Sequence, residues 1–127
     1  MIQVFLNKWF GTLPLRLIKL DKPVKVKKPS RYAKYLTGTT FKEDYRCLKT
    51  FVSGYGVSIP PLVNTYMNMS AHMQYFGTGL NDEFGNIYDS GILIPFENMA
   101  DDKVSRHVKT VNPKLLYRLR TLLHRKR

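Results

Sequence analysis

The stretch from residue 73 to residue 96 constrains the fold of this chain more than any other part of the sequence. Residues 73–80 form a short β-like run, and residues 87–96 form a second run with three consecutive apolar side chains. Four turn-forming residues separate the two runs: Asn81, Asp82, Gly85 and Asn86. Short apolar runs bounded by Asn, Asp and Gly are typical of strands joined by a turn. The sequence therefore predicts a strand, a turn and a second strand.

An amphipathic helix is expected before these strands. Thr40 and Glu43 have the spacing of a capping box, and apolar residues then recur at intervals of three and four up to Tyr55. Gly54 and Gly56 should end this helix, because glycine readily takes the left-handed conformation that closes helices.

Three further helices are expected. Pro60 and Pro61 suit the first turn of a short helix, since a proline there gives up an amide that would be unpaired anyway. Two leading aspartates favour a helix over residues 101–108, because their charge complements the exposed amides at that end. Residues 113–127 predict a last helix with five leucines on one face and basic side chains on the other.

The apolar content of the chain is enough for one hydrophobic core and not for two. Of the 127 residues, 43% are hydrophobic. Helices that precede and follow two strands predict an α/β or α+β fold. The single cysteine, Cys47, lies within a helical pattern, so we expect it to be a small apolar filler. The three histidines are isolated in the sequence, and we therefore expect no metal site.

The charge of the chain favours an anionic partner. Its 21 Lys and Arg outnumber its 9 Asp and Glu, which gives a formal net charge of +12. Nucleic acid is the less expected partner, because the basic residues gather away from the aromatic ones. The sequence contains no P-loop, nucleotide fingerprint or nucleophile elbow.

The first 38 residues are expected to form an apolar segment followed by a basic linker. Residues 1–20 are rich in apolar side chains but are interrupted by four others: Lys8, Pro14, Arg16 and Lys19. No run is long enough to span a bilayer and no cleavage site is visible, so we expect a cytoplasmic protein. Residues 19–34 predict an extended basic linker, since Pro23 and Pro29 prevent a continuous helix.

One block of the sequence resembles a known family. Residues 59–70 read IPPLVNTYMNMS and residues 72–96 read HMQYFGTGLNDEFGNIYDSGILIPF, with KPSRYAKYLTG and DDKVSRHV on the flanks. This pattern resembles the C-terminal region of the hemolysin-like GNAT family, which includes ornithine-lipid and related aminolipid N-acyltransferases. The residues that carry the resemblance are Pro60, Pro61, Leu62, Tyr66, Asn81, Glu83, Phe84, Gly85 and Asp89. The chain departs from the family at Asn81, where members usually have Asp, and by one extra residue between Phe84 and the next acid.

The resemblance implies a partial GNAT-like (acyl-CoA N-acyltransferase-like) α/β unit, with helices packed on a small mixed sheet. We expect three regions: an apolar segment and basic linker (1–38), a GNAT-like C-terminal portion (39–110) and a basic amphipathic helix (111–127). The implied activity transfers a fatty acyl group from an acyl carrier protein thioester to the amine of an amino acid. The products would be aminolipids of the ornithine- or glycine-lipid type. An upstream segment or subunit is expected to supply the donor-binding half, and no bound cofactor is expected.

The resemblance also assigns roles to individual residues. Glu83 and Asp89 are the predicted catalytic carboxylates near the acceptor amine, and four residues are predicted to bind substrate: Tyr66, Phe76, Phe84 and Asn81. A plainer interpretation stays open for each, in which Glu83 is a solvated turn acid and Asp89 makes a structural hydrogen bond. The aromatic and methionine side chains of residues 66–76 could line an acyl-chain groove or belong to the core.

The alternative function is a basic module without catalysis that binds an anionic membrane surface or nucleic acid. The last helix suits the inner face of a membrane, because its leucine stripe is flanked by basic side chains. The predicted anion-binding residues are Lys114, Arg118, Arg120, Arg125, Lys126 and Arg127. Docking of the same leucines onto the core of the protein would give the same pattern.

Overall fold

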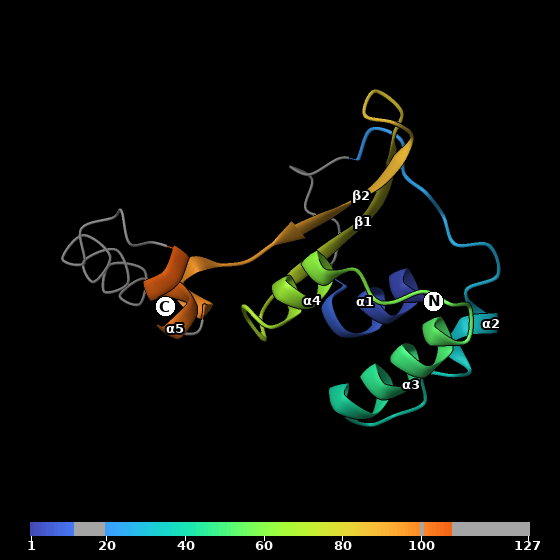
Figure 1. The fold of residues 1–127 in the computed structure, drawn as a ribbon, viewed down its shortest axis with the longest axis horizontal. Coiled ribbons are helices and arrows are strands. Elements are labelled where there is room, and N and C mark those ends of the chain that lie inside the picture. Colours follow the sequence, from blue (N-terminus) through green and yellow to red (C-terminus); the bar gives the residue numbers. More distant parts are fainter. Residues whose placement is uncertain (12–19, 100, 108–127) are drawn as a thin grey trace.

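A computed structural model describes residues 1–11, 20–99 and 101–107 of the chain (Figure 1). The helix expected over 113–127, its six anion-binding residues and its membrane contact lie outside the described residues. Among the described helices, none combines the length and apolar character that crossing a membrane requires.

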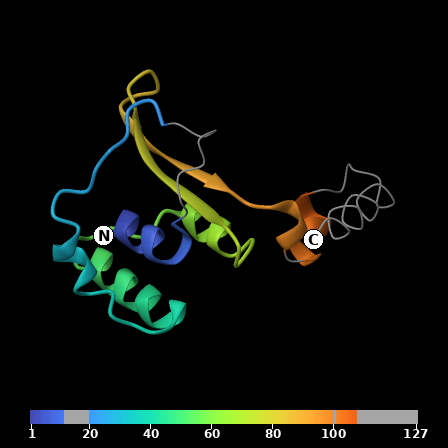
Figure 2. The same ribbon diagram turned by 180° about the vertical axis from the view of Figure 1, so that it is seen from behind.

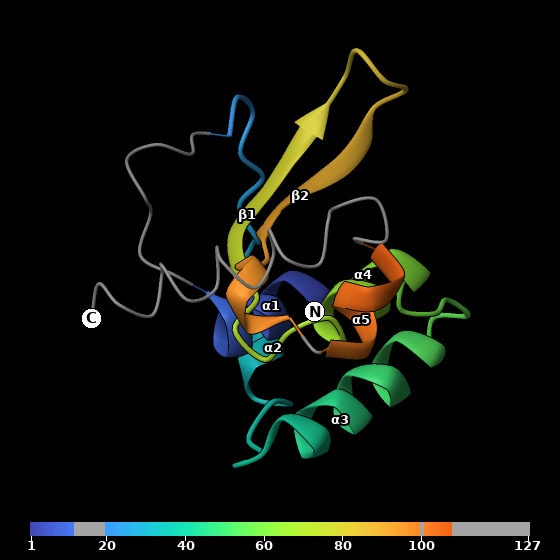
Figure 3. The ribbon, with the colours of Figure 1, turned by 90° about the vertical axis from the view of Figure 1, so that its left-hand side faces the viewer.

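The described elements form a mixed α and β structure, as expected. In chain order they are α1 (Ile2–Phe10), α2 (Ser30–Ala33), α3 (Phe41–Ser53), α4 (Pro61–Met67), β1 (Gln74–Asn81), β2 (Ile87–Leu93), a short 3-10 helix (Phe96–Asn98) and α5 (Asp101–His107). The two strands make an antiparallel hairpin that rises away from the helices (Figures 1 and 3). The small mixed sheet that we expected is therefore an antiparallel pair, with one isolated parallel bridge between Gly11 and Tyr75.

The capping box predicted the start of α3 correctly. The Thr40 side chain accepts a hydrogen bond from the Glu43 amide, and the Glu43 carboxylate accepts one from the Thr40 amide. Of the two glycines expected to take a left-handed conformation at the end of this helix, only Gly56 does so, with φ of 69°. Gly54 ends the helix in a right-handed conformation. The expected burial of Cys47 is wrong: this cysteine is exposed. It lies off the stripe made by Asp44, Leu48 and Val52, which is the side of α3 that is buried.

The N-terminal helix, which the sequence pattern did not predict, supplies much of the core. Phe5 and Leu6 of α1 are fully buried and pack with Leu48 of α3 and Tyr75 of β1. The ring of Phe5 lies 5.4 Å from that of Phe41, a separation at which tilted aromatic pairs are favourable. The apolar residues of 1–10 thus form the centre of the fold.

Residues 20–29 of the basic linker are free of helix, as expected, and pair with the free side of β1, whereas Ser30–Ala33 form α2, which corrects the expectation of an extended segment up to residue 34. The Val24 amide donates to the Thr78 carbonyl at 2.8 Å, and the Leu80 amide donates to the Lys22 carbonyl at 2.9 Å. Figure 2 shows this segment running beside the hairpin before it turns to α2. The Leu20 side chain packs beside Gly77, Gly79 and Gly91, and a Cβ at Gly77 would lie only 3.0 Å from Leu20 Cδ1.

A buried carboxylate ties the helices together. Asp44 is fully buried and accepts hydrogen bonds from Lys8 Nζ at 2.6 Å, Trp9 Nε1 at 3.0 Å and the Gly38 amide at 2.8 Å. Lys8 also donates to the carbonyls of Leu36 and Gly38. Burial by itself would raise the pKa of Asp44, but the hydrogen bonds from Lys8, Gly38 and Trp9 outweigh it and the pKa is lowered.

We predict that Asp44→Asn lowers the free energy of unfolding at neutral pH by about 3 kcal/mol, because Lys8 loses its buried counter-charge. Since the pKa of Asp44 is lowered on folding, its contribution is present above the unfolded pKa and is lost as pH falls through the folded one. Chemical denaturation from pH 7 to pH 2 should therefore show the wild type losing its advantage over the variant. Asp82→Asn, at an exposed ion pair, is the control and should change little. An Asp44→Asn variant as stable as the wild type at pH 7 would contradict this assignment.

Candidate functional site

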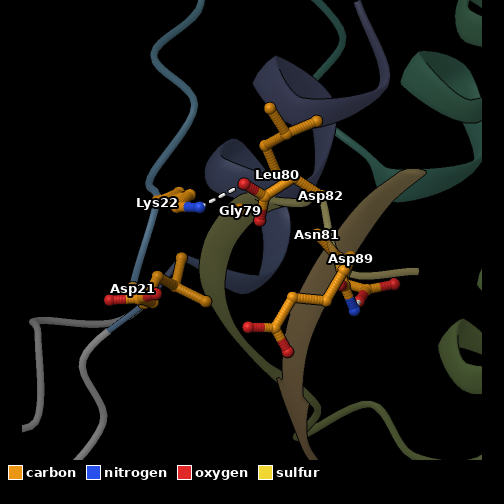
Figure 4. A pocket seen from close by; sticks show the side chains of 9 residues that line it. Asp21, Lys22, Gly79, Leu80, Asn81, Asp82 and Asp89 are labelled. Atoms are coloured by element: carbon orange, nitrogen blue, oxygen red, sulfur yellow. Dashed lines mark hydrogen bonds and ion pairs between the residues drawn. The ribbon is translucent and has the colours of Figure 1, made fainter. Parts of the chain in front are cut away.

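The acidic end of the hairpin is the candidate site. A cavity of about 250 Å³ opens there between the linker and the hairpin, as Figure 4 shows from close by. Its lining comes from the linker (Leu20, Asp21, Lys22), the end of β1 (Gly79, Leu80, Asn81), the turn (Asp82, Glu83) and β2 (Asp89). Four of the nine acidic residues of the chain therefore surround one cavity, together with a single lysine.

Two side-chain pairs order this end of the hairpin. Lys22 forms an ion pair with Asp82, which links the linker to the turn. Across the two strands, Asn81 Nδ2 donates to Asp89 Oδ2 at 2.7 Å. The other end of the same amide, Asn81 Oδ1, accepts from the Phe84 backbone amide at 3.1 Å and so fixes the turn. A residue with both a donor and an acceptor is needed at position 81, and this explains why Asn fits there.

The predicted site residues fall into two groups in the structure. Asn81, Glu83, Phe84 and Asp89 come together at the hairpin end. Tyr66 is partly buried on α4, where it packs against the core, and Phe76 is partly buried in the first half of β1. These two residues do not line the acidic cavity.

Exposure distinguishes between the interpretations left open for the acids. Glu83 is exposed and the neighbouring Phe84 side chain is 73% exposed, so Phe84 does not shield the Glu83 carboxylate from water. The structure favours the solvated-turn interpretation of Glu83 in the chain as described. Asp89 is exposed and makes the structural hydrogen bond to Asn81 that we considered for it. The catalytic roles of both acids stay predictions.

The methionine and aromatic side chains belong mainly to the core. Met67, Met73 and Tyr75 are at most 7% exposed, which favours the core interpretation over an acyl-chain groove for these three. A different apolar cavity, of about 330 Å³, lies between α1, the linker and β1. Its apolar walls come from Val4, Val24, Val26, Pro29 and Tyr75, and its polar ones include Gln3, Asn7 and Thr78.

A chain of hydroxyl groups crosses the hairpin beside this second cavity. The Tyr75 hydroxyl lies 2.7 Å from Thr78 Oγ1, which lies 2.9 Å from Ser90 Oγ. Burial raises the pKa of Tyr75 and outweighs the hydrogen bonds from Thr78 and Ser90, which act in the opposite direction, so this phenol stays protonated at neutral pH. The sequence pattern indicated neither this series of hydroxyl groups nor the position of Lys22 at the site, because both depend on residues that the hairpin and the linker bring together.

We predict that Asn81→Asp, which restores the acid usual in the family named above, destabilises the hairpin at neutral pH. The new carboxylate keeps the acceptor for the Phe84 amide but faces Asp89 with a like charge at hydrogen-bond distance. The loss should shrink at about pH 4, because protonation of one carboxylate removes the repulsion. Thermal unfolding at both pH values measures it, with Asn81→Ala as the uncharged control. A loss for Asn81→Asp that does not depend on pH would contradict the charge argument.

Comparison with known proteins gives two significant relatives, both with the same name. Over 111 residues the chain is 41% identical to a glycine N(alpha)-acyltransferase from Phocaeicola vulgatus, an alignment that covers 87% of the chain and 34% of that relative. Over 110 residues it is 37% identical to a glycine N(alpha)-acyltransferase from Bacteroides thetaiotaomicron, covering 87% of the chain and 33% of the relative. No family model matches the chain, and no solved structure matches it.

The chain thus spans about a third of the length of the curated relatives it matches. Their shared name supports the acyltransferase part of the expected relationship. The hemolysin-like and GNAT assignments, the acyl carrier protein donor and the aminolipid product stay predictions.

Proposed function

We propose that this chain is part of an N-acyltransferase whose acceptor is the amino group of glycine, and that the acidic end of the hairpin binds this acceptor. The observation that carries the proposal is the similarity of 87% of the chain to two proteins named glycine N(alpha)-acyltransferase. Because those relatives are about three times as long, the activity is proposed for a complete enzyme of which this chain is one part.

The charges at the hairpin end suit a small zwitterion. Free glycine carries an ammonium and a carboxylate only a few atoms apart. Asp89 and Glu83 offer carboxylates for the ammonium, and Lys22 offers an ammonium for the carboxylate. The Lys22 and Asp82 side chains are 50% and 45% exposed, so their ion pair contributes little and can open to admit a ligand at small cost.

The reaction requires a proton acceptor and a held thioester. The amine nitrogen forms an amide bond with the acyl carbonyl carbon, the carbon–sulfur bond of the thioester breaks, and the nitrogen gives one proton to the leaving thiolate, which departs as a thiol. Before it attacks, the ammonium of bound glycine must lose another proton. A carboxylate at the acidic end that holds the ammonium is placed to accept this proton, directly or through water. Glu83 or Asp89 would serve, and positioning of the two reactants would supply most of the rate enhancement.

The second cavity is the proposed location of the acyl chain. Both cavities lie along the same pair of segments, since the acidic one contacts linker residues 20–22 and β1 residues 79–81. The apolar one contacts linker residues 24–26 and β1 residues 75, 77 and 78. An acyl group in the second cavity would then direct its thioester toward the acidic end. A fatty acyl group carried by acyl carrier protein is the donor that the family resemblance favours.

One observation favours the alternative function of a basic module. Eight exposed cations lie between residues 25 and 49, with Glu43 as the one exposed acid in that range: Lys25, Lys27, Lys28, Arg31, Lys34, Lys42, Arg46 and Lys49. Such a surface suits an anionic membrane or nucleic acid. Residues 30–49 of this range belong to α2, α3 and the segment between them, away from the acidic end (Figure 1), so an acyltransferase part could also use these cations for docking.

We predict that glycine at millimolar concentration shifts the amide NMR signals of residues 79–89 and of Lys22 in the isolated chain. Acetate and methylamine, which each carry one of the two charges of glycine, should bind more weakly because each satisfies half of the site. Asp89→Asn should weaken the binding of glycine, and Glu97→Gln, outside the cavity, should not. Shifts confined to the exposed cations of residues 25–49, produced equally by acetate, would support the basic-module alternative and contradict the acceptor site.

A further inference from the structure

The outer edge of β2 presents unpaired backbone groups. β1 lies between β2 on one side and the linker on the other, since the Thr78 carbonyl and the Leu80 amide bond to linker residues. In an antiparallel strand the two backbone groups of one residue point to the same side, and successive residues alternate. Gly77, Gly79 and Asn81 therefore bond toward β2.

The register of the hairpin then shows which groups of β2 face outward. Gly77, Gly79 and Asn81 pair with Gly91, Asp89 and Ile87, so these β2 residues bond inward. The amide and carbonyl groups of Tyr88, Ser90 and Ile92 point to the outer edge. In the part of the chain that the structure describes, no segment pairs with them.

Apart from the charge of Asp89, this edge lacks the features that keep natural sheet edges apart. Free edges are usually short, or carry lysine, proline or a bulge that prevents pairing with another strand. β2 is seven residues long, contains no lysine or proline, and the one irregularity of the hairpin is an extra residue in β1. Tyr88 is 68% exposed, and Ile87 and Leu93 are 43% and 41% exposed. An accessible apolar strand of this kind is a typical pairing surface.

The sequence of β2 is complementary to itself about Ser90. If two copies of IYDSGIL pair antiparallel with Ser90 opposite Ser90, Ile87 faces Leu93 and Tyr88 faces Ile92. Asp89 faces Gly91, so no like charge lies directly opposite the one charged residue of the strand. The outward groups of Tyr88, Ser90 and Ile92 fall at hydrogen-bonded positions of this register, so the backbone and the side chains require the same alignment.

We propose that two copies of this chain associate through the outer edge of β2, around a two-fold axis at Ser90, to form a continuous four-stranded antiparallel sheet. A C2 interface of this kind uses the same surface on both copies, which the self-complementary strand provides. We commit to a second copy as the partner for two reasons. Pairing β2 with itself places apolar residues opposite each other, and it places Asp89 opposite Gly91. None of the eight exposed cations of residues 25–49 lies on β2: four belong to α2 and α3, and the other four belong to the linker and the residue after α2. The linker pairs with the side of β1 that is opposite β2.

The test compares Ser90→Pro with Ser90→Ala in the full chain by sedimentation equilibrium. Proline removes the outward backbone amide of residue 90 at the axis and leaves the inward hydrogen bonds of Asp89 and Gly91 intact. Both variants lose the Ser90 hydroxyl, so Ser90→Ala is the control for that loss. We expect the wild type and Ser90→Ala to have twice the mass of the monomer and Ser90→Pro to have half that of the wild type. The circular dichroism of all three should agree.

A cross-link tests the register without weakening the strand. In a Cys47→Ser background, Ser90→Cys places two thiols opposite each other across the axis, where Cα atoms about 5.5 Å apart allow a disulfide. Oxidation should give a covalent dimer, and Lys49→Cys in the same background should not. A monomeric wild type overturns the proposal. This holds both if the edge is open, so that the amides of Tyr88, Ser90 and Ile92 exchange rapidly with solvent, and if another part of the chain covers the edge and protects these amides. A dimer that survives Ser90→Pro and forms no cross-link at position 90 also overturns it.

Discussion

The fully buried carboxylate of Asp44 is the constraint on which the arrangement of the helices depends. A charge taken out of water is costly unless it is paired and hydrogen-bonded, and three donors meet this requirement. Two of them, Lys8 and Trp9, come from α1, and the third is the Gly38 amide in the loop before α3. A Cβ at Gly38 would lie 2.7 Å from Asp44 Oδ1, so the loop closes on the carboxylate only because this residue is glycine. The same contacts bring Phe5 and Leu6 into the core beside Leu48.

Once α1 is packed against α3, few other positions are open to the linker and the hairpin. α1 packs against both α3 and β1, and the linker fills the remaining edge of β1 with Leu20 against three glycines. This arrangement separates the charges of a strongly basic chain. The acids gather at the hairpin end, whereas the exposed cations of residues 25–49 lie toward the helices. A small zwitterionic acceptor and an anionic docking partner would thus bind at different places.

Local patterns predicted the elements of this fold better than they predicted the site. The capping box at Thr40, the prolines before α4, the turn between the strands and the start of α5 are each set by neighbouring residues, and the sequence indicated all of them. The expected burial of Cys47 was wrong, because a helical pattern does not by itself show which face of the helix the rest of the fold covers. The pairing of Asp44 with Lys8 spans 36 positions and could not be predicted from spacing. One signal was present, since an acid on the apolar stripe of a helix must have a partner.

The candidate site was predicted in part for the same reason. Asn81, Glu83, Phe84 and Asp89 belong to one turn and its flanking strands, so their proximity followed from the hairpin. Lys22 and Asp21 enter from the linker, and nothing in their local sequence pointed to the hairpin end. Tyr66 and Phe76 were predicted to bind substrate but do not line the acidic cavity, because Tyr66 packs against the core from α4 and Phe76 lies in the first half of β1, at the other end of the strand.

The most direct test of the proposed function is a chimera with the relative from Phocaeicola vulgatus. The region of that protein that aligns with this chain would be replaced by the chain, and the rate of acyl transfer to glycine would be compared with that of the parent. If this chain supplies the acceptor side of a glycine N-acyltransferase, the chimera should acylate glycine within roughly tenfold of the parent rate. Asp89→Asn in the chimera should then raise the KM for glycine. A folded chimera that still cleaves the acyl donor but does not acylate glycine would contradict the account.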